Sequence, residues 1–186
     1  MKSITKQIVQ HYDPVLSPYS TAYRKTHSCE TTLSRLIEDW RLSLDQKLSV
    51  GILSTDVSKA FDSLQQTLML RKLQAYGFNK TTDILRSYFQ DRMNRDRLGS
   101  LVSEWRSVDR GCPQGSSLGP LMWNLYQYDL AQFIKDTDFS MYADDHQVYV
   151  SDHSIESIQE KLNTNREIAS QWYKKNFLQA TKTNTM

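Results

Sequence analysis

Alternating hydrophobic and polar positions predict β-strands in two parts of this chain. Residues 48–56, LSVGILSTD, carry mostly apolar side chains and are predicted to form a largely buried strand. Residues 139–150, FSMYADDHQVYV, alternate in polarity on both sides of a central acidic pair and are rich in β-branched and aromatic types. Since Asp tolerates turn conformations, including positive φ, the second segment predicts a tight hairpin with Asp144 and Asp145 at its tip.

Apolar residues at helical spacing predict helices between and around these strands. Ser28 is the expected N-cap of one helix, and Gly77 is the expected C-terminal cap of another. The predicted helices are residues 1–12, a segment after Ser28, a segment from Asp62–Ser63 to Gly77, residues 82–89, a segment capped by Ser116 or Ser117 that runs through Leu130, and residues 154–172. The helix after Ser28 carries Leu33, Leu36, Ile37 and Trp40 on one face, and the helix over residues 154–172 turns Ile155, Ile158, Leu162 and Ile168 inward. Residues 176–186 predict the start of a further strand.

Residues 91–110 form the most basic part of the sequence. This segment holds five arginines and four acidic residues. Leu98-Gly99-Ser100 in its middle predicts the tip of a hairpin. The arginines form either an ordinary solvated face or a surface that follows a phosphate backbone, and the local sequence leaves both open.

The composition is that of an ordinary globular domain. At 186 residues, with 39% hydrophobic and 24% charged residues, the chain suffices for one domain or most of one. A net charge of +2 permits a nucleic-acid partner without pointing to one, and Cys29 and Cys112 are too few for a disulfide framework. Because no segment approaches the about 18 apolar residues of a membrane span and the N-terminus lacks a signal-peptide core, we expect an intracellular protein, cytoplasmic or nuclear, without a membrane partner.

Three acidic residues are the candidates for chemistry. Asp56 ends a buried strand, where a carboxylate needs a partner, a proton or a metal ion. Asp144 and Asp145 repel each other, and either solvent at an ordinary turn or a bound divalent cation relieves that repulsion. An acid at a strand end and an acid pair on a neighbouring hairpin can converge on a two-metal site, which stabilises both oxygens in phosphoryl transfer.

Two further segments have the composition of ligand sites. Residues 110–120, RGCPQGSSLGP, hold three glycines and two prolines, so a ligand could approach the backbone closely at the entrance to a helix. Arg24 and Lys25 lie just before the helix that follows Ser28, where free N–H groups favour anions. Each segment is equally compatible with an ordinary solvated loop. The order of elements predicts an α+β fold, a largely antiparallel sheet with helices packed on one face.

Taken together, the motifs resemble the reverse transcriptase of a non-long-terminal-repeat (LINE-type) retrotransposon. The blocks that carry the resemblance are Asp56 to Asp62 (DVSKAFD), Arg110 to Pro120 (RGCPQGSSLGP), Met141 to Asp145 (MYADD) and, more weakly, Tyr23 to Ser28 (YRKTHS). They cover nearly the whole chain in the family's order. The resemblance implies one reverse transcriptase domain over residues 1–186, a polymerase palm with part of the fingers and without a thumb, in which about 1–47 belong to the fingers side and 48–186 mainly to the palm.

This family resemblance implies RNA-directed DNA polymerase activity, with an RNA template, a DNA primer and dNTPs as partners. Asp56 and Asp144 would bind two Mg²⁺ ions, or Mn²⁺, with Asp145 as the third carboxylate and the main-chain carbonyl of Val57 facing the ions. Phe61, five residues after Asp56, would be an aromatic wall that excludes a 2′-hydroxyl. The oligomeric state stays open.

Further binding roles are implied by the same resemblance. The residues expected to meet the dNTP are Arg24, Lys25, Phe61, Gln114 and Gly115, and those expected to meet primer or template are Tyr142, Arg92, Arg95, Arg97 and Pro113. His146 has no role in this chemistry and is expected to be structural.

Several positions depart from the family's pattern. Asp96 stands where relatives carry an aliphatic residue, Tyr128 stands where Asn is commoner, and Lys182 is the nearest match to a late lysine that is thought to protonate pyrophosphate. The early fingers segment, the thumb and an endonuclease domain are also missing, so a catalytically silent relic is the alternative to an active polymerase. A nucleotide cyclase, another palm-type two-metal enzyme, is disfavoured because it needs no template pocket such as the Pro113–Gly115 loop suggests.

Overall fold

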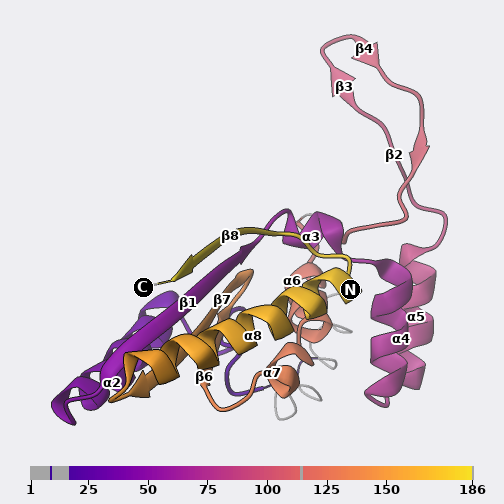
Figure 1. Ribbon diagram of the computed structural model, residues 1–186. Helices are drawn as coiled ribbons and strands as arrows, with labels where there is room; N and C mark the ends of the chain where they lie inside the picture. The colour runs from indigo at the N-terminus through magenta and orange to yellow at the C-terminus, as the bar shows by residue number, and fades with distance from the viewer. Residues whose placement is uncertain (1–8, 10–16, 114, 186) are drawn as a thin grey trace.

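The computed structural model describes residue 9, residues 17–113 and residues 115–185 (Figure 1). Its centre is a four-stranded antiparallel sheet in the order β6-β7-β1-β8. The strands are β1 (Ser49–Val57), β6 (Asp138–Tyr142), β7 (Asp145–Asp152) and β8 (Ala180–Thr185). The strand predicted over 48–56 is confirmed to within one residue at each end, and β8 confirms the strand predicted near the end of the sequence. The predicted helix over residues 1–12 and Gln114 lie outside the described residues.

The hairpin between β6 and β7 is confirmed, but its turn differs from the prediction by one residue. Tyr142 pairs with Asp145, so the loop is Ala143–Asp144 and Asp145 is the first residue of β7. Ala143, rather than either Asp, takes the left-handed conformation, with φ of 55°. This shift places Asp145 in the sheet, directly opposite Asp56 of β1.

Seven helices surround the sheet among the described residues. They are α2 (Cys29–Asp45), α3 (Ala60–Ser63), α4 (Gln66–Ala75), α5 (Asn79–Phe89), α6 (Gly119–Tyr126), α7 (Leu130–Phe133) and α8 (Ile155–Lys175). The predicted helices that fall within the described residues are present, although two of them are divided. The segment expected to begin at Asp62–Ser63 splits into α3 and α4 around Leu64, whose ψ of 118° is not helical. The segment expected to run through Leu130 splits into α6 and α7.

Local sequence accounts for several helix ends. Ser28 caps α2, because its hydroxyl accepts the N–H of Thr31 while the Thr31 hydroxyl accepts the N–H of Ser28. Ser154 caps α8 by accepting the N–H of Ser157. Gly77, with φ of +89°, follows α4 in the left-handed conformation that ends many helices. Ser116 does not cap α6 directly, but its hydroxyl accepts the N–H of Leu118, the residue before that helix.

Helices lie on both faces of the sheet. On one face α8 packs so closely that a Cβ atom on Gly51 would lie 2.2 Å from Cγ2 of Ile158. On the other face α2 crosses β7, where the Tyr149 hydroxyl donates to Asp39 at 2.7 Å. The predicted α+β class with an antiparallel sheet is confirmed, but the helices lie on both faces rather than on one, because α2 covers the second face (Figure 1).

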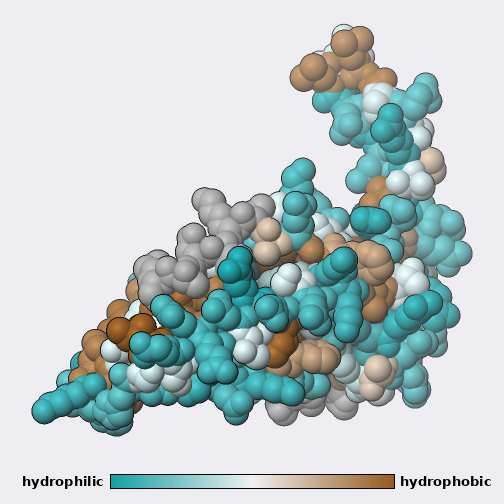
Figure 2. Space-filling view, in the orientation of Figure 1, coloured by the Kyte–Doolittle hydropathy of each residue, from teal (hydrophilic) through white to brown (hydrophobic). Residues whose placement is uncertain are grey.

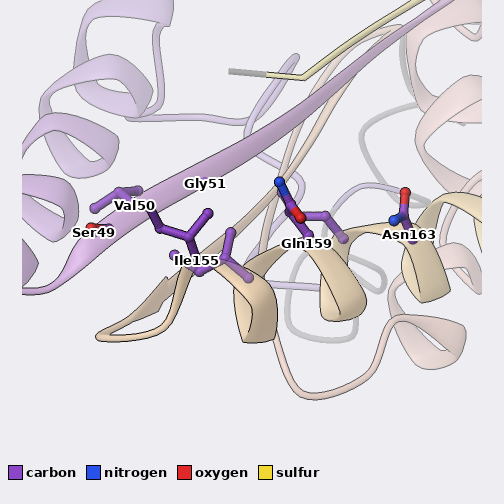
Figure 3. Close-up of a pocket in the computed structure, with 8 residues that line it drawn as sticks. Ser49, Val50, Gly51, Ile155, Gln159 and Asn163 are labelled. Atoms are coloured by element: carbon purple, nitrogen blue, oxygen red, sulfur yellow. The ribbon is translucent and has the colours of Figure 1, made fainter.

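Three side chains expected in the core are exposed. Leu36 of α2 is buried, but Leu33 and Ile37 of the same predicted face are each 51% exposed, because α2 turns only one row of residues toward the sheet. Ile155 is 58% exposed and lies beside a cavity of about 510 Å³ between the start of β1 and α8 (Figure 3). No strand lies beside β1 on its β8 side before Leu53 in the described part of the chain, which leaves this edge open.

A long β-hairpin projects from the body next to α5 (Figure 1). Its strands are β2 (Met93–Asn94), β3 (Arg97–Leu98), β4 (Leu101–Val102) and β5 (Arg106–Ser107), with β2 paired to β5 and β3 to β4. The hairpin tip predicted at Leu98-Gly99-Ser100 is confirmed. Figure 2 shows an apolar tip above a polar stem, and Leu98 is 81% exposed there.

The described residues contain neither a disulfide nor a helix that could span a membrane. Cys29 is exposed and Cys112 is buried, and neither forms a disulfide. None of the helices in the described ranges combines the length and the apolar character needed to cross a membrane.

Candidate active site

Two acidic residues from different parts of the sequence face each other at one end of the sheet. Asp56 is paired with Asp145 across the β1–β7 ladder, and this pair is the last one in that ladder. The N–H of Val57 donates to the main-chain oxygen of Asp144 at 3.3 Å, which fastens the turn to the end of β1. The fold therefore gathers Asp56, Val57, Asp144 and Asp145 at one end of the sheet, as the sequence predicted. These four residues form the acidic edge.

A side chain of α6 supports the turn between β6 and β7, which carries Asp144. The indole N–H of Trp123, a fully buried residue, donates to the carbonyl oxygen of Ala143 at 2.8 Å. Since Ala143 has a positive φ, this hydrogen bond supports a backbone conformation that a residue with a Cβ atom adopts at some cost. Trp123 had no role in the sequence prediction, because nothing in an apolar helix shows where one indole N–H points.

The charges of the three carboxylates act on one another. Partial desolvation, followed by the negative charges of Asp144 and Asp56, raises the pKa of the Asp145 carboxyl. Burial, followed by the charges of Asp144 and Tyr142, raises the pKa of the Tyr23 hydroxyl. Both shifts disfavour further negative charge, so the edge of the sheet has the electrostatics of a cation site.

The acidic edge fits a divalent metal ion in its chemistry, although the side chains do not form a closed cage. Within the described ranges, no group of three acidic, histidine or cysteine side chains could enclose a metal ion as the side chains stand. Mg²⁺ commonly takes only one or two carboxylates and fills its other positions with water and substrate phosphates. Facing carboxylates at the end of a ladder, with mutual repulsion, are donors of that kind, so the residues present fit the ion.

Phe61 lies beside the acidic edge and forms one wall of a pocket. Its ring lies 5.8 Å from that of Trp123 and 6.2 Å from that of Tyr23, measured between centroids. A cavity of about 430 Å³ separates it from the glycine-rich loop, with Pro113, Gly115, Ser116, Ser117, Gly119 and Pro120 as the other lining residues. The structure thus brings together Phe61, Pro113 and Gly115 from the predicted set.

The glycine-rich loop reaches this position because of one glycine. The N–H of Gly111 donates to the oxygen of Leu64 at 2.7 Å, and the N–H of Cys112 donates to the oxygen of Phe61 at 3.0 Å. A Cβ atom on Gly111, whose φ is +75°, would lie 3.0 Å from Cα of Asp62. Only glycine permits this approach without strain, so the loop is fixed against the backbone that carries Phe61.

Tyr23 is a site residue that the sequence block contained without an assigned role. The segment before it lies beside β6, since the N–H of Thr21 donates to the main-chain oxygen of Met141. It is also held by α6, because the Asn124 side chain donates to the main-chain oxygen of Ala22. These bonds place the Tyr23 ring edge against Phe61. The signal available in the sequence was only its position at the start of the weak fourth block.

The basic residues expected to bind phosphates are less concentrated at the site. The Arg24 guanidinium donates to the carbonyl oxygens of Ser17 and Ser20, at 3.2 and 3.0 Å, and Lys25 is exposed. Arg92 lies over the Tyr88 ring and Arg95 over the Trp105 ring, at 5.4 and 4.5 Å from the ring centroids. Arg97 donates to the oxygen of Gly99.

Three more residues lie around the acids. The backbone of Lys182 in β8 pairs with Asp56, on the side of β1 away from Asp145. His146, next to Asp145, is 2% exposed and its side chain lies on the α8 face, opposite to the acids. Tyr142 is half-buried beside Asp145, and both line a cavity of about 240 Å³ against α2.

The comparisons with known proteins agree with this geometry. The family model described as reverse transcriptase (RNA-dependent DNA polymerase) matches residues 1–186. A probable RNA-directed DNA polymerase from transposon X-element of Drosophila melanogaster is 31% identical over 65% of this chain. A retrovirus-related Pol polyprotein from a type-1 R1 element of Bradysia coprophila is 29% identical over 88% of it.

Solved telomerase structures share this fold. Apo telomerase from Candida tropicalis superposes with a TM-score of 0.73 over 100% of this chain and 36% of its own, at 12% identity. Telomerase from Candida albicans gives 0.70 over 98% of this chain and 34% of its own, at 16% identity. The chain spans only 13% and 16% of the two transposon relatives.

Proposed function

The chain belongs to the reverse transcriptase family, and on that premise we propose that it is the fingers–palm part of an RNA-directed DNA polymerase. It would add deoxynucleotides from dNTPs to the 3′-hydroxyl of a DNA primer on an RNA template. The observation that carries the proposal is the pairing of Asp56 with Asp145 at the end of the β1–β7 ladder, beside Asp144. Residues 1–47 would belong to the fingers side and 48–186 mainly to the palm.

The three carboxylates would bind the catalytic ions. Asp56 and Asp144, with Asp145 and the main-chain oxygen of Val57, would hold two Mg²⁺ or Mn²⁺ ions, which when bound lower the pKa of the primer hydroxyl and neutralise charge on the triphosphate. Partial desolvation, followed by the charges of Asp144 and Asp56, raises the pKa of the Asp145 carboxyl, so a cation brought to this end of the sheet would favour its ionised form. The hydrogen bond from the Val57 N–H to the main-chain oxygen of Asp144 keeps β1, which carries Asp56, in register with the turn, which carries Asp144.

The pocket beside Phe61 would take the nucleotide. Phe61 is held between Trp123 and Tyr23, so its ring has little room to move away from a sugar. A fixed ring at this place would clash with a 2′-hydroxyl and select deoxynucleotides. Pro113 and Gly115 line the same cavity, and the family resemblance implies that Gln114 would also meet the dNTP.

Primer, template and triphosphate contacts are the least constrained part of the proposal. Tyr142 flanks the acidic edge and would meet the primer end. Arg92, Arg95 and Arg97 lie along the projecting hairpin, where they would contact phosphates of the template or primer. Arg24 and Lys25 would meet the triphosphate, and Arg24 would then exchange its carbonyl partners for phosphate oxygens.

Primer extension tests this function. A longer chain that supplies a thumb should extend a DNA primer on an RNA template with Mg²⁺ or Mn²⁺. The Asp144→Ala and Asp145→Ala versions should lose this activity, while Asp83→Ala, which changes an exposed acid on α5, should keep it. Equal extension by the wild-type chain and the Asp144→Ala, Asp145→Ala chain would refute the proposal.

A further inference from the structure

A chain of buried side chains lies directly behind the acidic edge. The Tyr173 hydroxyl of α8 lies 2.7 Å from Oγ1 of Thr55 and 2.8 Å from Nδ1 of His146. Thr55 precedes Asp56 on β1, and His146 follows Asp145 on β7. Because successive residues of a strand point to opposite faces, one hydroxyl on the α8 face touches the immediate neighbours of two acids on the other face.

The same chain extends to the end of α6. Nε2 of His146 lies 2.9 Å from Oε1 of Gln127, and Gln127 is fully buried. A neutral imidazole has one donor and one acceptor nitrogen, so the three hydrogen bonds can run in one direction, from the Thr55 hydroxyl through Tyr173 and His146 to the amide oxygen of Gln127. The rings of His146 and Tyr173 are also stacked, with centroids 5.8 Å apart and planes inclined by 9°.

This chain of bonds lies where backbone pairing ends. The β1–β7 ladder stops at the Asp56–Asp145 pair, and the β1–β8 register shifts between Asp56 and Val57. Just beyond that pair the N–H of Val57 donates to the oxygen of Asp144, but no further residue of β1 is paired with β7 in the described part of the chain, where the two carboxylates repel each other. The side-chain link through Tyr173 spans the two strands one residue before the ladder ends.

We propose that Tyr173 is a positioning residue for the acidic edge, whose hydroxyl joins Thr55 to His146 and so fixes the spacing of Asp56 and Asp145. This inference rests on the proposed function of those acids as metal ligands. The removal of one buried oxygen atom should therefore loosen the acids and weaken cation binding, while the fold remains. Outer contacts of this kind commonly change metal affinity by about tenfold or more.

A matched control lies in the same core. The Tyr126 hydroxyl donates to the main-chain oxygen of Asn176 at 2.7 Å, and Tyr126 is fully buried. Tyr126→Phe removes a buried hydroxyl from a hydrogen bond of similar length, but its partner is not next to an acid. Any effect common to Tyr173→Phe and Tyr126→Phe is a general loss of stability, and the difference between them reports on the acids.

The first measurement uses the metal-free chain. The Val57 amide donates to the oxygen of Asp144, so its hydrogen-exchange rate reports how firmly the turn is held to β1. Tyr173→Phe should speed exchange at Val57 about tenfold more than Tyr126→Phe does, after correction for global stability. Equal exchange at Val57 in the two variants would overturn the proposal.

The second measurement is Mn²⁺ binding followed by electron paramagnetic resonance, with Asp144→Asn as the reference. Tyr173→Phe should weaken Mn²⁺ binding about tenfold, and Tyr126→Phe should leave it unchanged. If Asp144→Asn weakens binding and Tyr173→Phe does not, the positioning role is refuted and the metal site stands. If Asp144→Asn has no effect, the proposed function itself is contradicted, and the exchange rates at Val57 still decide the role of Tyr173.

Discussion

Trp123 donates its indole N–H to the carbonyl oxygen of Ala143 at 2.8 Å, and the same ring packs against Phe61. One buried side chain therefore touches both the turn that carries the acids and the wall of the proposed nucleotide pocket. This contact connects α6 to two parts of the site that are more than 80 residues apart in the sequence.

The replacement Trp123→Phe should affect the site more than its effect on stability explains. It leaves the Ala143 oxygen without its donor, which costs about 1–3 kcal/mol. Trp172→Phe is the matched control, since the Trp172 N–H donates to Asp129, and Trp172 is also buried. In primer extension by a longer chain, Trp123→Phe should lower kcat, whereas Trp172→Phe should lower only the unfolding midpoint. Equal kcat in both variants would contradict this coupling.

Sugar selection should depend on Phe61. Phe61→Val shortens the side chain beside the cavity that Pro113 and Gly115 also line, so a 2′-hydroxyl would find space. The ratio of kcat/KM for dNTP over rNTP should fall by about 10- to 100-fold, as expected when one steric contact is removed from a pocket. Phe89→Leu, a change in the core away from the cavity, should leave this ratio as it is. An unchanged ratio in Phe61→Val would exclude the steric role.

The buried ion pair of Lys72 should be important for stability. Its ammonium group donates to Asp129 and to the main-chain oxygen of Tyr126, both at 2.7 Å, and Lys72 is 8% exposed. Lys72→Met leaves Asp129 without its cationic partner, and the free energy of unfolding should fall by about 3 kcal/mol.

A comparison with Arg41 shows why burial decides the size of this effect. Arg41 pairs with Glu38 and Asp45 on the exposed side of α2, also at 2.7 Å. Because water screens these charges, Arg41→Ala should lower the free energy of unfolding much less than Lys72→Met does. Urea denaturation of both variants makes the comparison, and similar losses would show that burial does not determine the effect.

Acid should weaken the start of α8 through Asp152. Hydrogen bonds from the Ser157 hydroxyl, from Lys161 and from the Ser154 N–H hold the pKa of this carboxyl well below its usual range. A lowered carboxyl pKa adds stability at pH values above the ordinary carboxyl pKa of about 3.9, and this stability is lost as the pH falls below that value.

Urea denaturation at pH 7 and about pH 3 measures this contribution. Asp152→Asn should lower stability at pH 7 and reduce the further loss on acidification. Asp83→Asn, at an exposed position on α5, should leave both values close to those of the unchanged chain. If Asp152→Asn is as sensitive to acid as the unchanged chain, Asp152 has no part in the acid response.

The sequence predicted the elements well because their signals are local. Ser28, Ser154 and Gly77 mark helix ends through hydrogen bonds and dihedral angles within a few residues of each position. The turn of the hairpin was misplaced by one residue, because the choice between Ala143 and an Asp for the positive φ depends on the donor from Trp123. The sequence predicts too wide a buried face for α2, since the spacing of apolar residues does not show how many rows of side chains the sheet covers.

The sequence by itself determined which residues are the candidates for chemistry, because Asp56, the Gly111–Pro120 loop and Asp144–Asp145 form motifs that resemble those of the reverse transcriptase family. Only the tertiary structure decided how these motifs meet. The register that sets Asp56 opposite Asp145, the approach of Gly111 to Asp62, and the buried contacts of Trp123 and Tyr173 all join residues distant along the chain. Such contacts depend on strand pairing and close packing, which no local pattern encodes.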